Sequence, residues 1–427
     1  MPSKVRRVLR WSFRLVAVSL CALVGAIRLV APATAGDAAG VRRQLAFLRA
    51  AIDGGAATDA QALYPEGYFF MHVLYGLTWV ELGMRGKPAD RAAPLREARW
   101  AFTQLSSPAG RAPFSEGLTP SYGVFYRGWS NWLLGGVLGL QPADRRDPGE
   151  LRRFVDDSAA LGAAFDASAS PFLTAYPGQA WPVDSTVAIA SLRLHDALLP
   201  ARYTATVQRW LGGVRDRLDP RTGLMPHRVS AGTGEPAEVA RATSQSIIHR
   251  FLPDIDPAFA RDQYLRFRDQ YVVRRLGPAV REYPAGMDGP ADVDSGPLPL
   301  GVSLSATVVT IGAAQVNHDD ALAGALANYG EFAGVPVSTP WTKRYALGLL
   351  PVGDAFLAWS KTARPWVAAP PPAPPASITW WWRLPLLLIL TVLGTGPWLP
   401  ALLRHRRRVR PGTGWRAWRP SAPAPTT

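Results

Sequence analysis

Two kinds of helical segment alternate along most of this chain, and this alternation limits what it can fold into. Between residues 38 and 362, charged amphipathic segments such as 40–53 and 150–165 place apolar residues at helical spacing on one face. Between them lie segments that are apolar on nearly every side, and such a helix is buried on every side. These apolar segments begin near residues 66, 125, 181, 242, 294 and 343.

The repeat of about 50–60 residues matches one helical hairpin with its loops, and repeats of this size indicate a closed or stacked array. Six charged outer helices around six apolar inner ones predict an all-α fold, an (α/α)6 toroid of six hairpins. We therefore expect one toroid domain at 38–362. A linear solenoid is the alternative, but it carries polar capping repeats at its ends, and none is clear here.

The first 37 residues are typical of a signal peptide or a signal anchor. Basic residues precede a short apolar run, and Ala33-Thr34-Ala35 is a candidate cleavage site. The basic residues are Lys4, Arg6, Arg7 and Arg10.

The C-terminal end predicts a membrane anchor. A proline-rich linker, 363–379, has the composition of a stiff, extended spacer. A transmembrane helix follows at 380–403, with three tryptophans at its outer boundary, and then a basic tail, 404–427. Basic residues mark the cytoplasmic side. The sequence thus predicts a plasma-membrane protein with a cytoplasmic C-terminal tail and an extracytoplasmic main domain.

The charge distribution argues against nucleic acid as a partner. The formal net charge is +15, but much of the excess flanks the two apolar ends, where membrane lipid explains it. The only cysteine is Cys21, so the toroid has no disulfide, thiol nucleophile or cysteine-ligated metal. With no dinucleotide fingerprint, Walker loop or zinc helix, we expect no cofactor.

In a toroid the inner helices run parallel, so the loops before them meet at one mouth. These loops are rich in aromatic residues and carboxylates, the composition of a ligand cavity. Asp184, in the first turn of its helix, is the predicted general acid or base, with Asp294 or Asp292 as partner. Predicted substrate-binding residues are Tyr68, Tyr126, Trp129, Tyr176, Trp181, His227, Gln245, Tyr283 and Tyr345.

Structural roles explain the same residues equally well. An aspartate at a helix start is often a cap or a first-turn charge, and the aromatic residues fit simple packing. The D-x-D of Asp292 and Asp294 has no further ligand pattern, so no metal site is expected.

Four stretches, 176–196, 218–236, 254–271 and 280–320, carry a resemblance to the linalool dehydratase-isomerase family of (α/α)6 proteins. The similarity covers roughly residues 60–360. The resemblance implies a terpenol site with cysteines and a histidine, one cysteine corresponding to Asp184 and the histidine to Trp129. Neither residue type stands at those positions. The resemblance therefore implies the fold and the pocket with a different acid–base set.

Three functions follow as hypotheses. The first is carboxylate acid–base chemistry, a dehydration or isomerisation, on an isoprenoid-like or other apolar alcohol. The second is a glycoside hydrolase or lyase acting on cell-envelope glycan, which also needs two carboxylates. The third is a non-catalytic binding or scaffold protein.

Overall fold

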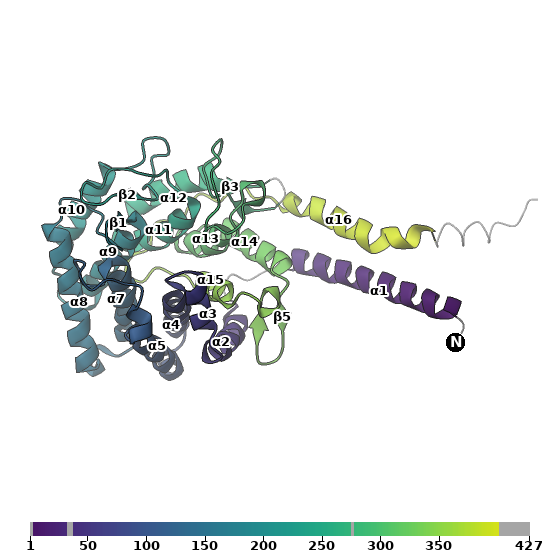
Figure 1. Ribbon diagram of the computed structural model, residues 1–427, viewed down its shortest axis with the longest axis horizontal. Helices are drawn as coiled ribbons and strands as arrows, with labels where there is room; N and C mark the ends of the chain where they lie inside the picture. The colour runs from purple at the N-terminus through teal and green to yellow at the C-terminus, as the bar shows by residue number, and fades with distance from the viewer. Residues whose placement is uncertain (1–2, 32–36, 275–276, 401–427) are drawn as a thin grey trace, which may run out of the picture. The chain divides into compact units, whose positions relative to one another are not determined.

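The computed structural model describes residues 3–31, 37–274 and 277–400 (Figure 1). The chain divides into two compact units. One is Leu29–Arg383, and the other combines Met1–Arg28 with Leu384–Thr427. Each unit is described by itself.

Six inner helices form a closed ring in the larger unit. Each packs against the next, and the last packs against the first, which confirms the predicted toroid and excludes an open solenoid. The inner helices are α4 (Gly67–Arg85), α7 (Gly123–Gly139), α9 (Pro182–Leu198), α11 (Ala242–Ile255), α13 (Leu304–Val316) and α15 (Pro351–Lys361).

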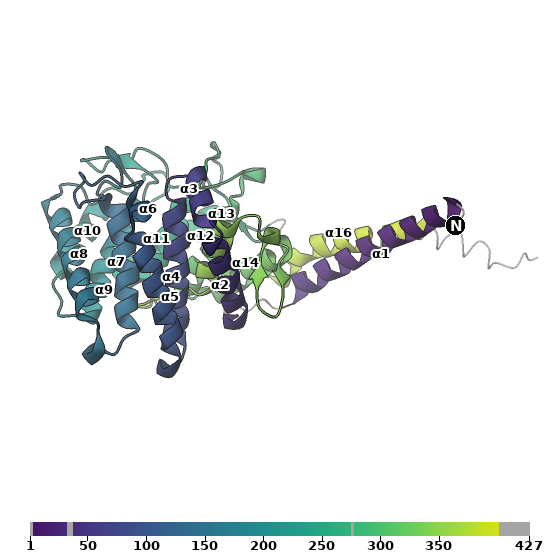
Figure 2. The same cartoon turned by 60° about the horizontal axis from the view of Figure 1, so that its bottom comes forward.

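Six outer helices surround this ring, as the charged segments predicted (Figures 1 and 2). They are α2 (Ala38–Asp53), α5 (Ala92–Leu105), α8 (Pro148–Ala167), α10 (Thr204–Arg215), α12 (Pro257–Tyr271) and α14 (Asp320–Ala333). Two short helices, α3 (Ala56–Leu63) and α6 (Pro108–Arg111), lie before α4 and α7 in the chain.

Small residues let the inner helices approach closely. A Cβ placed on Gly128 of α7 would lie 3.0 Å from the backbone of Ala188 in α9, so a larger residue there would force the two helices apart. Proline at the first position of α9 and α15 fixes a backbone angle suited to a helix start. The first four inner helices begin within two residues of the predicted starts, at Gly67, Gly123, Pro182 and Ala242, whereas the fifth and sixth begin later than predicted, at Leu304 rather than 294 and at Pro351 rather than 343.

Aromatic side chains fill the centre of the ring. Trp129 of α7 contacts Phe70 of α4, Phe251 of α11 and Trp359 of α15, with ring centroids 5.9, 5.3 and 5.6 Å apart. Trp129 and Trp359 are both 1% exposed. The toroid is thus a packed core rather than a channel, and any site must lie above this plug.

Short strands and 3-10 turns shape the connecting loops. Three antiparallel pairs are formed by β1 (Gln179–Ala180) with β2 (Val229–Ser230), β3 (Val272–Val273) with β4 (Ala279–Val280), and β5 (Val337–Ser338) with β6 (Lys343–Arg344). The 3-10 helices of this unit are η1 (Pro88–Arg91), η2 (Ala143–Arg145), η3 (Pro299–Gly301), η4 (Ala346–Gly348) and η5 (Trp380–Arg383), and η6 (Gly396–Trp398) belongs to the smaller unit. The β1–β2 pair ties the loop before α9 to the loop before α11.

The proline-rich segment packs against the toroid. Its backbone is extended, as its composition predicted, but it is bound along its length and does not act as a free spacer. Asp254 Oδ1, near the end of α11, accepts the backbone N–H groups of Trp366, Val367 and Ala368 at 2.8, 2.7 and 3.2 Å. The Trp366 ring stacks on Trp132 of α7 at 4.4 Å.

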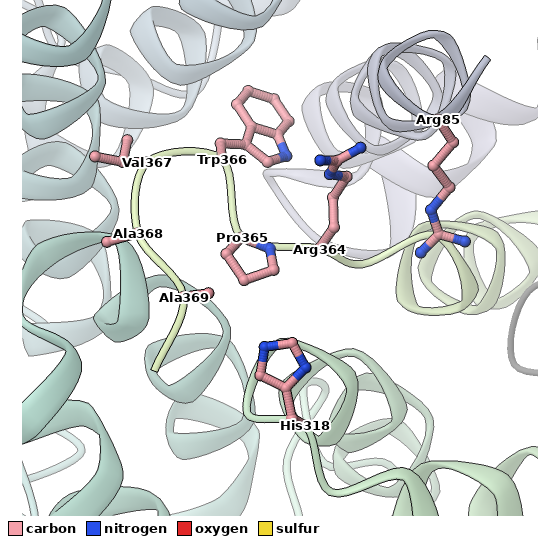
Figure 3. Close-up of a pocket in the computed structure, with 8 residues that line it drawn as sticks. All are labelled: Arg85, His318, Arg364, Pro365, Trp366, Val367, Ala368 and Ala369. Carbon is pink, nitrogen blue, oxygen red and sulfur yellow. The ribbon is translucent and has the colours of Figure 1, made fainter. Parts of the chain in front are cut away.

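The same segment lines a hollow of about 430 Å³ among the C-terminal ends of the inner helices (Figure 3). Arg85 and Arg364 tie it in place, since Arg85 donates to the Ala363 carbonyl and Arg364 to the Met84 carbonyl. The segment therefore covers the end of the ring opposite the predicted mouth.

The smaller unit contains α1 (Ser3–Val30) and α16 (Leu384–Thr395). Residues Leu9–Val30 form a helix long and apolar enough to cross a membrane, with a mean hydropathy of 2.1. This helix can serve as an anchor or as a signal sequence. The predicted transmembrane segment 380–403 is described only to residue 400, and the basic tail lies outside the described residues.

Candidate active site

Three carboxylates converge where the inner helices begin. Glu66 stands immediately before α4, Asp184 in the first turn of α9, and Asp294 in the loop before α13. The charges of Glu66 and Asp294 both raise the pKa of Asp184. The loops before the first, third and fifth inner helices thus contribute to one cluster, as the predicted mouth requires.

Asp184 is the most buried member of the cluster, at 5% exposed. Burial, together with the negative charges of Glu66 and Asp294, raises its pKa well above the usual value. Within the described residues, no donor is hydrogen-bonded to its carboxylate. A carboxyl group in this setting favours its protonated form, which is a proton donor.

Glu66 is not among the residues to which the sequence analysis assigns a role. In the structure Tyr176 donates its phenolic hydrogen to Glu66 Oε1. Burial and the Glu66 charge raise the pKa of Tyr176, so the phenol keeps its proton. The position of Glu66 in the sequence could have indicated this role. Glu66 immediately precedes an inner helix, Asp184 lies in the first turn of one, and Asp294 lies in the loop before another.

The Tyr176 ring belongs to an aromatic wall beside the carboxylates. It stacks on Phe114 at 6.0 Å and meets Trp181 edge-on at 5.8 Å. Tyr176 and Trp181 are both half-buried, so part of each ring faces outward. This wall agrees with the predicted binding role for both residues, which stays a prediction.

Asp294 lies at the outer side of the cluster. Burial and the charges of Asp292 and Glu66 raise its pKa to about 6. Because the Asp294 residue is solvent-exposed, the neighbouring charges contribute more to this rise than burial does. With a pKa of about 6, Asp294 is ionised at neutral pH, and the surroundings of Asp184 favour the protonated form of that carboxyl group.

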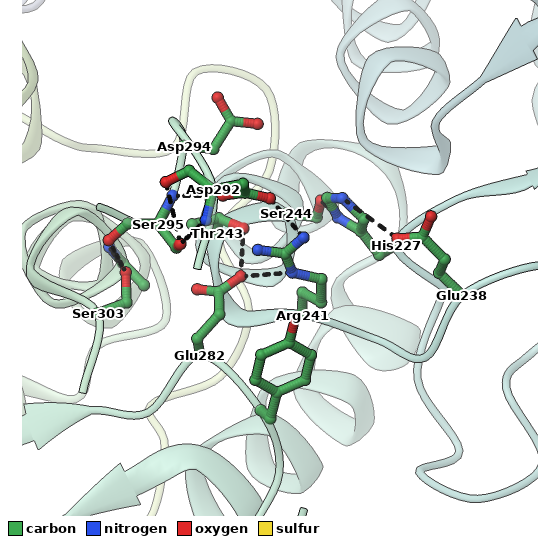
Figure 4. A network of polar contacts seen from close by, with 12 residues as sticks. His227, Glu238, Arg241, Thr243, Ser244, Glu282, Asp292, Asp294, Ser295 and Ser303 are labelled. Atoms are coloured by element: carbon green, nitrogen blue, oxygen red, sulfur yellow. Dashed lines mark hydrogen bonds and ion pairs between the residues drawn. The ribbon is translucent and has the colours of Figure 1, made fainter. Parts of the chain in front are cut away.

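Asp292 has a different environment from Asp294 (Figure 4). Arg241 Nη1 lies 2.5 Å from Asp292 Oδ2, and Ser295 donates its backbone N–H to Asp292 Oδ1 at 2.9 Å. Although burial alone would raise it, Arg241 and Ser295 hold the pKa of Asp292 below its usual value. Of the two predicted partners for Asp184, Asp294 fits better, because its charge acts on Asp184, whereas Asp292 is bound by Arg241 and Ser295 and anchors the loop.

Arg241, immediately before α11, organises that loop. Its Nε donates to Glu282 Oε1 at 2.8 Å, and its guanidinium lies 5.3 Å from the centre of the Tyr283 ring. Thr243 also donates to Glu282 Oε1, at 2.7 Å. The Arg241 network therefore joins the loops before α11 and α13 and fixes the backbone that carries Asp294.

His227 lies near Arg241 (Figure 4). Its Nδ1 is 2.6 Å from Ser244 Oγ, and its Nε2 is 4.0 Å from Glu238. Burial and the Arg241 charge lower its pKa to about 4, so the imidazole is neutral at physiological pH.

The other predicted binding residues have partners of their own. Tyr68 donates to Gln104, Tyr126 to the Leu105 carbonyl, Gln245 to the Met225 carbonyl, Tyr283 to the Pro290 carbonyl and Tyr345 to Glu331, while Trp129 lies in the central plug. Tyr345 also accepts from Lys361, within a separate cluster of the sixth hairpin. The structure therefore brings together only part of the predicted set.

The described residues contain no group of three or more metal-ligating side chains. The Arg241 charge acts on Asp294 and opposes the rise in its pKa. The arrangement suits proton transfer between a neutral carboxylic acid and an ionised neighbour.

No protein-family model matches this chain. No curated protein matches it either. Among solved structures, a GH76 α-mannanase from Bacteroides thetaiotaomicron has a TM-score of 0.41 and 10% sequence identity, over 68% of this chain and 85% of that one. The resemblance to the linalool dehydratase-isomerase family stays a prediction.

Proposed function

We propose that the toroid is an acid–base catalyst that dehydrates or isomerises an isoprenoid-like or other apolar alcohol. Asp184 is the general acid: it protonates the hydroxyl group, and water leaves. Asp294, or Glu66 beside it, takes a proton from the neighbouring carbon, and a double bond forms. The observation that carries this proposal is a buried carboxyl group, Asp184, with two further carboxylates near it and no donor bound to it.

The aromatic wall supports the same chemistry. Departure of water from a tertiary or allylic carbon leaves positive charge, and aromatic faces stabilise a cation by about 0.5–2 kcal/mol. Tyr176 and Trp181 present half-buried rings next to Glu66. A cationic transition state at this position is stabilised by the rings and by the ionised carboxylates together.

An apolar rim beside the cluster supports an apolar substrate. It consists of exposed residues at the end of α3, which precedes α4, and in the loops or first turns at α13 and α15. Helices α4, α13 and α15 are neighbours in the ring, because α15 packs against both others. Their exposure runs from 52% to 81%: Leu63, Val293, Leu300, Leu304, Leu347, Leu349 and Leu350. Leu300 and Leu347 have positive φ angles of 54° and 60°. Strained backbone and exposed leucines beside a polar cluster are typical of a binding surface.

A glycoside hydrolase or lyase acting on cell-envelope glycan is the second candidate. A protonated carboxyl group next to an ionised one also matches its general requirement, and half-exposed aromatic rings suit the faces of sugars. The apolar rim favours the alcohol substrate. We further propose that the protein is anchored in the plasma membrane with the toroid outside the cytoplasm, since basic residues flank both apolar ends on the side away from the toroid.

The test is turnover of a substrate panel by the purified full-length protein in detergent. Isoprenoid alcohols and envelope oligosaccharides are incubated separately, and products are identified by mass spectrometry. The proposal expects loss of water or rearrangement of an alcohol, abolished by Asp184→Asn. Cleavage of an oligosaccharide instead supports the glycosidase. Binding of a panel compound without turnover supports a non-catalytic protein and contradicts both enzymatic proposals.

A further inference from the structure

Helices α1 and α16 run alongside each other (Figures 1 and 2). Hydrogen bonds of the Ser19 side chain join α1 to the C-terminal segment. Ser19 Oγ donates to the Gly394 carbonyl at 2.7 Å. Trp398 Nε1 donates to the same Ser19 Oγ at 2.8 Å. Ser19 lies near the middle of the apolar stretch Leu9–Val30. One serine thus satisfies a backbone carbonyl of α16 and the indole N–H of Trp398, in the 3-10 turn η6 that follows α16, at the depth where lipid offers no partner.

The two helices touch through small residues. A Cβ placed on Gly394 would lie 3.2 Å from Ala22 Cβ and 3.9 Å from Ser19 Cα. Ala22 is 8% exposed, whereas Leu20 and Leu23 beside it are 58% and 56% exposed. One narrow face of α1 therefore contacts α16, and the remaining apolar side chains are exposed. Helices that pair within a membrane have this arrangement.

The ends of these segments are also paired where they join the toroid. Within the larger unit, Arg383 Nε donates to the Leu29 carbonyl at 3.0 Å. Ser19 and Gly394 are each about three helical turns from this point along their own segments. The two contacts agree with one antiparallel register.

We propose that α1 is not removed as a signal peptide but remains in the mature protein, where it forms an antiparallel transmembrane pair with the predicted span 380–403, which contains the 12-residue helix α16. Cleavage after Ala35 would remove Ser19 and leave the Trp398 indole unpaired in lipid, which is costly. Both chain ends then face the cytoplasm, where the basic residues before α1 and after α16 belong. The proposal is independent of the chemistry at the mouth.

The first test is the intact mass of the full-length protein, carrying a C-terminal tag and purified from membranes. The proposal expects a chain that retains the residues before Ala33. A mature chain beginning at Gly36 would overturn it.

The second test measures the pairing directly by cysteine cross-linking. Cys21→Ser removes the only native cysteine. Adding Ala22→Cys with Gly394→Cys places two Cβ atoms close to the separation that a disulfide spans, about 3.5–4.5 Å. Oxidation in membranes is expected to give an intramolecular disulfide, seen as a linked peptide pair by mass spectrometry.

The matched control pairs Ala22→Cys with Val392→Cys, because Val392 is 57% exposed and faces away from the contact. We expect at least a tenfold lower yield from the control. Equal yields from both pairs, or disulfides only between chains, would overturn the pairing even if α1 is retained.

Discussion

Tyr176 donates its phenolic hydrogen to Glu66, and this bond joins the loop before α9 to the residue that precedes α4. The two residues are 110 positions apart in the sequence. The helix between them in the ring, α7, contacts both α4 and α9. Ring closure therefore brings distant loops to one mouth and surrounds Asp184 with negative charge.

Replacing Asp184 with asparagine is expected to abolish turnover, by about 10²–10⁴-fold, because the variant has no proton to donate. Asparagine has nearly the same shape, so circular dichroism should be unchanged. Glu116→Asn, at an exposed loop position, is the matched control and should keep full activity. Turnover at the wild-type rate in Asp184→Asn would remove Asp184 from the mechanism.

The same substitution is expected to stabilise the fold. The pKa of Asp184 is raised in the folded state, so folding binds a proton above the unfolded pKa, and stability falls as pH rises. Asparagine does not titrate, so it contributes no such pH dependence to the stability. We expect the Tm of Asp184→Asn to exceed the wild-type Tm by about 2 °C or more at pH 8, with a smaller difference at pH 4. A lower Tm at pH 8 would show that the carboxylate is stabilised by a partner.

Activity is expected to have a bell-shaped pH dependence. It rises through pH about 6 as Asp294 becomes ionised, and it falls at higher pH as Asp184 loses its proton. Asp294→Asn should remove the acidic limb of kcat/KM while the alkaline limb remains. An acidic limb that persists in Asp294→Asn would assign the base to Glu66.

Replacing Arg241 with methionine is expected to destabilise the toroid by about 3–5 kcal/mol, because Glu282 and Asp292 would lose a buried cation. Urea unfolding measures the loss. The double variant Arg241→Met with Glu282→Gln should recover part of it, since one buried charge is removed as well. Additive losses in the double variant would contradict the pairing.

Trp366→Ala is expected to lower the Tm, because its ring stacks on Trp132 and covers the far end of the ring. We expect a cost of about 2 kcal/mol, less than for a fully buried tryptophan. Trp341→Ala is the control, since Trp341 is 77% exposed. If the Tm of Trp366→Ala changes as little as that of Trp341→Ala, the proline-rich segment does not stabilise the fold.

Much of the fold follows from the sequence, because a helix that is apolar on every side has to be surrounded. That argument predicted the inner helices, their order and the position of Asp184 at the mouth. It did not predict which aromatic residues fill the ring, because a helix apolar all round gives no direction to a single side chain. Trp129 thus lies in the plug, and Tyr345 pairs with Glu331.

The proline-rich segment shows a second limit. Its composition indicates an extended backbone, but the contacts that bind it come from single distant residues such as Asp254. Likewise, nothing local to Glu66 indicates that Tyr176 binds it. Such pairs depend on the final packing of loops and are not encoded in a short pattern.

The central claim is that Asp184 is a neutral carboxylic acid near neutral pH. Infrared difference spectroscopy of the wild-type protein against Asp184→Asn at pH 7 tests it directly. We predict that the wild type shows the C=O stretch of a protonated carboxyl group, absent from the variant and shifted by deuterium exchange. A difference spectrum showing only the loss of an ionised carboxylate would contradict it.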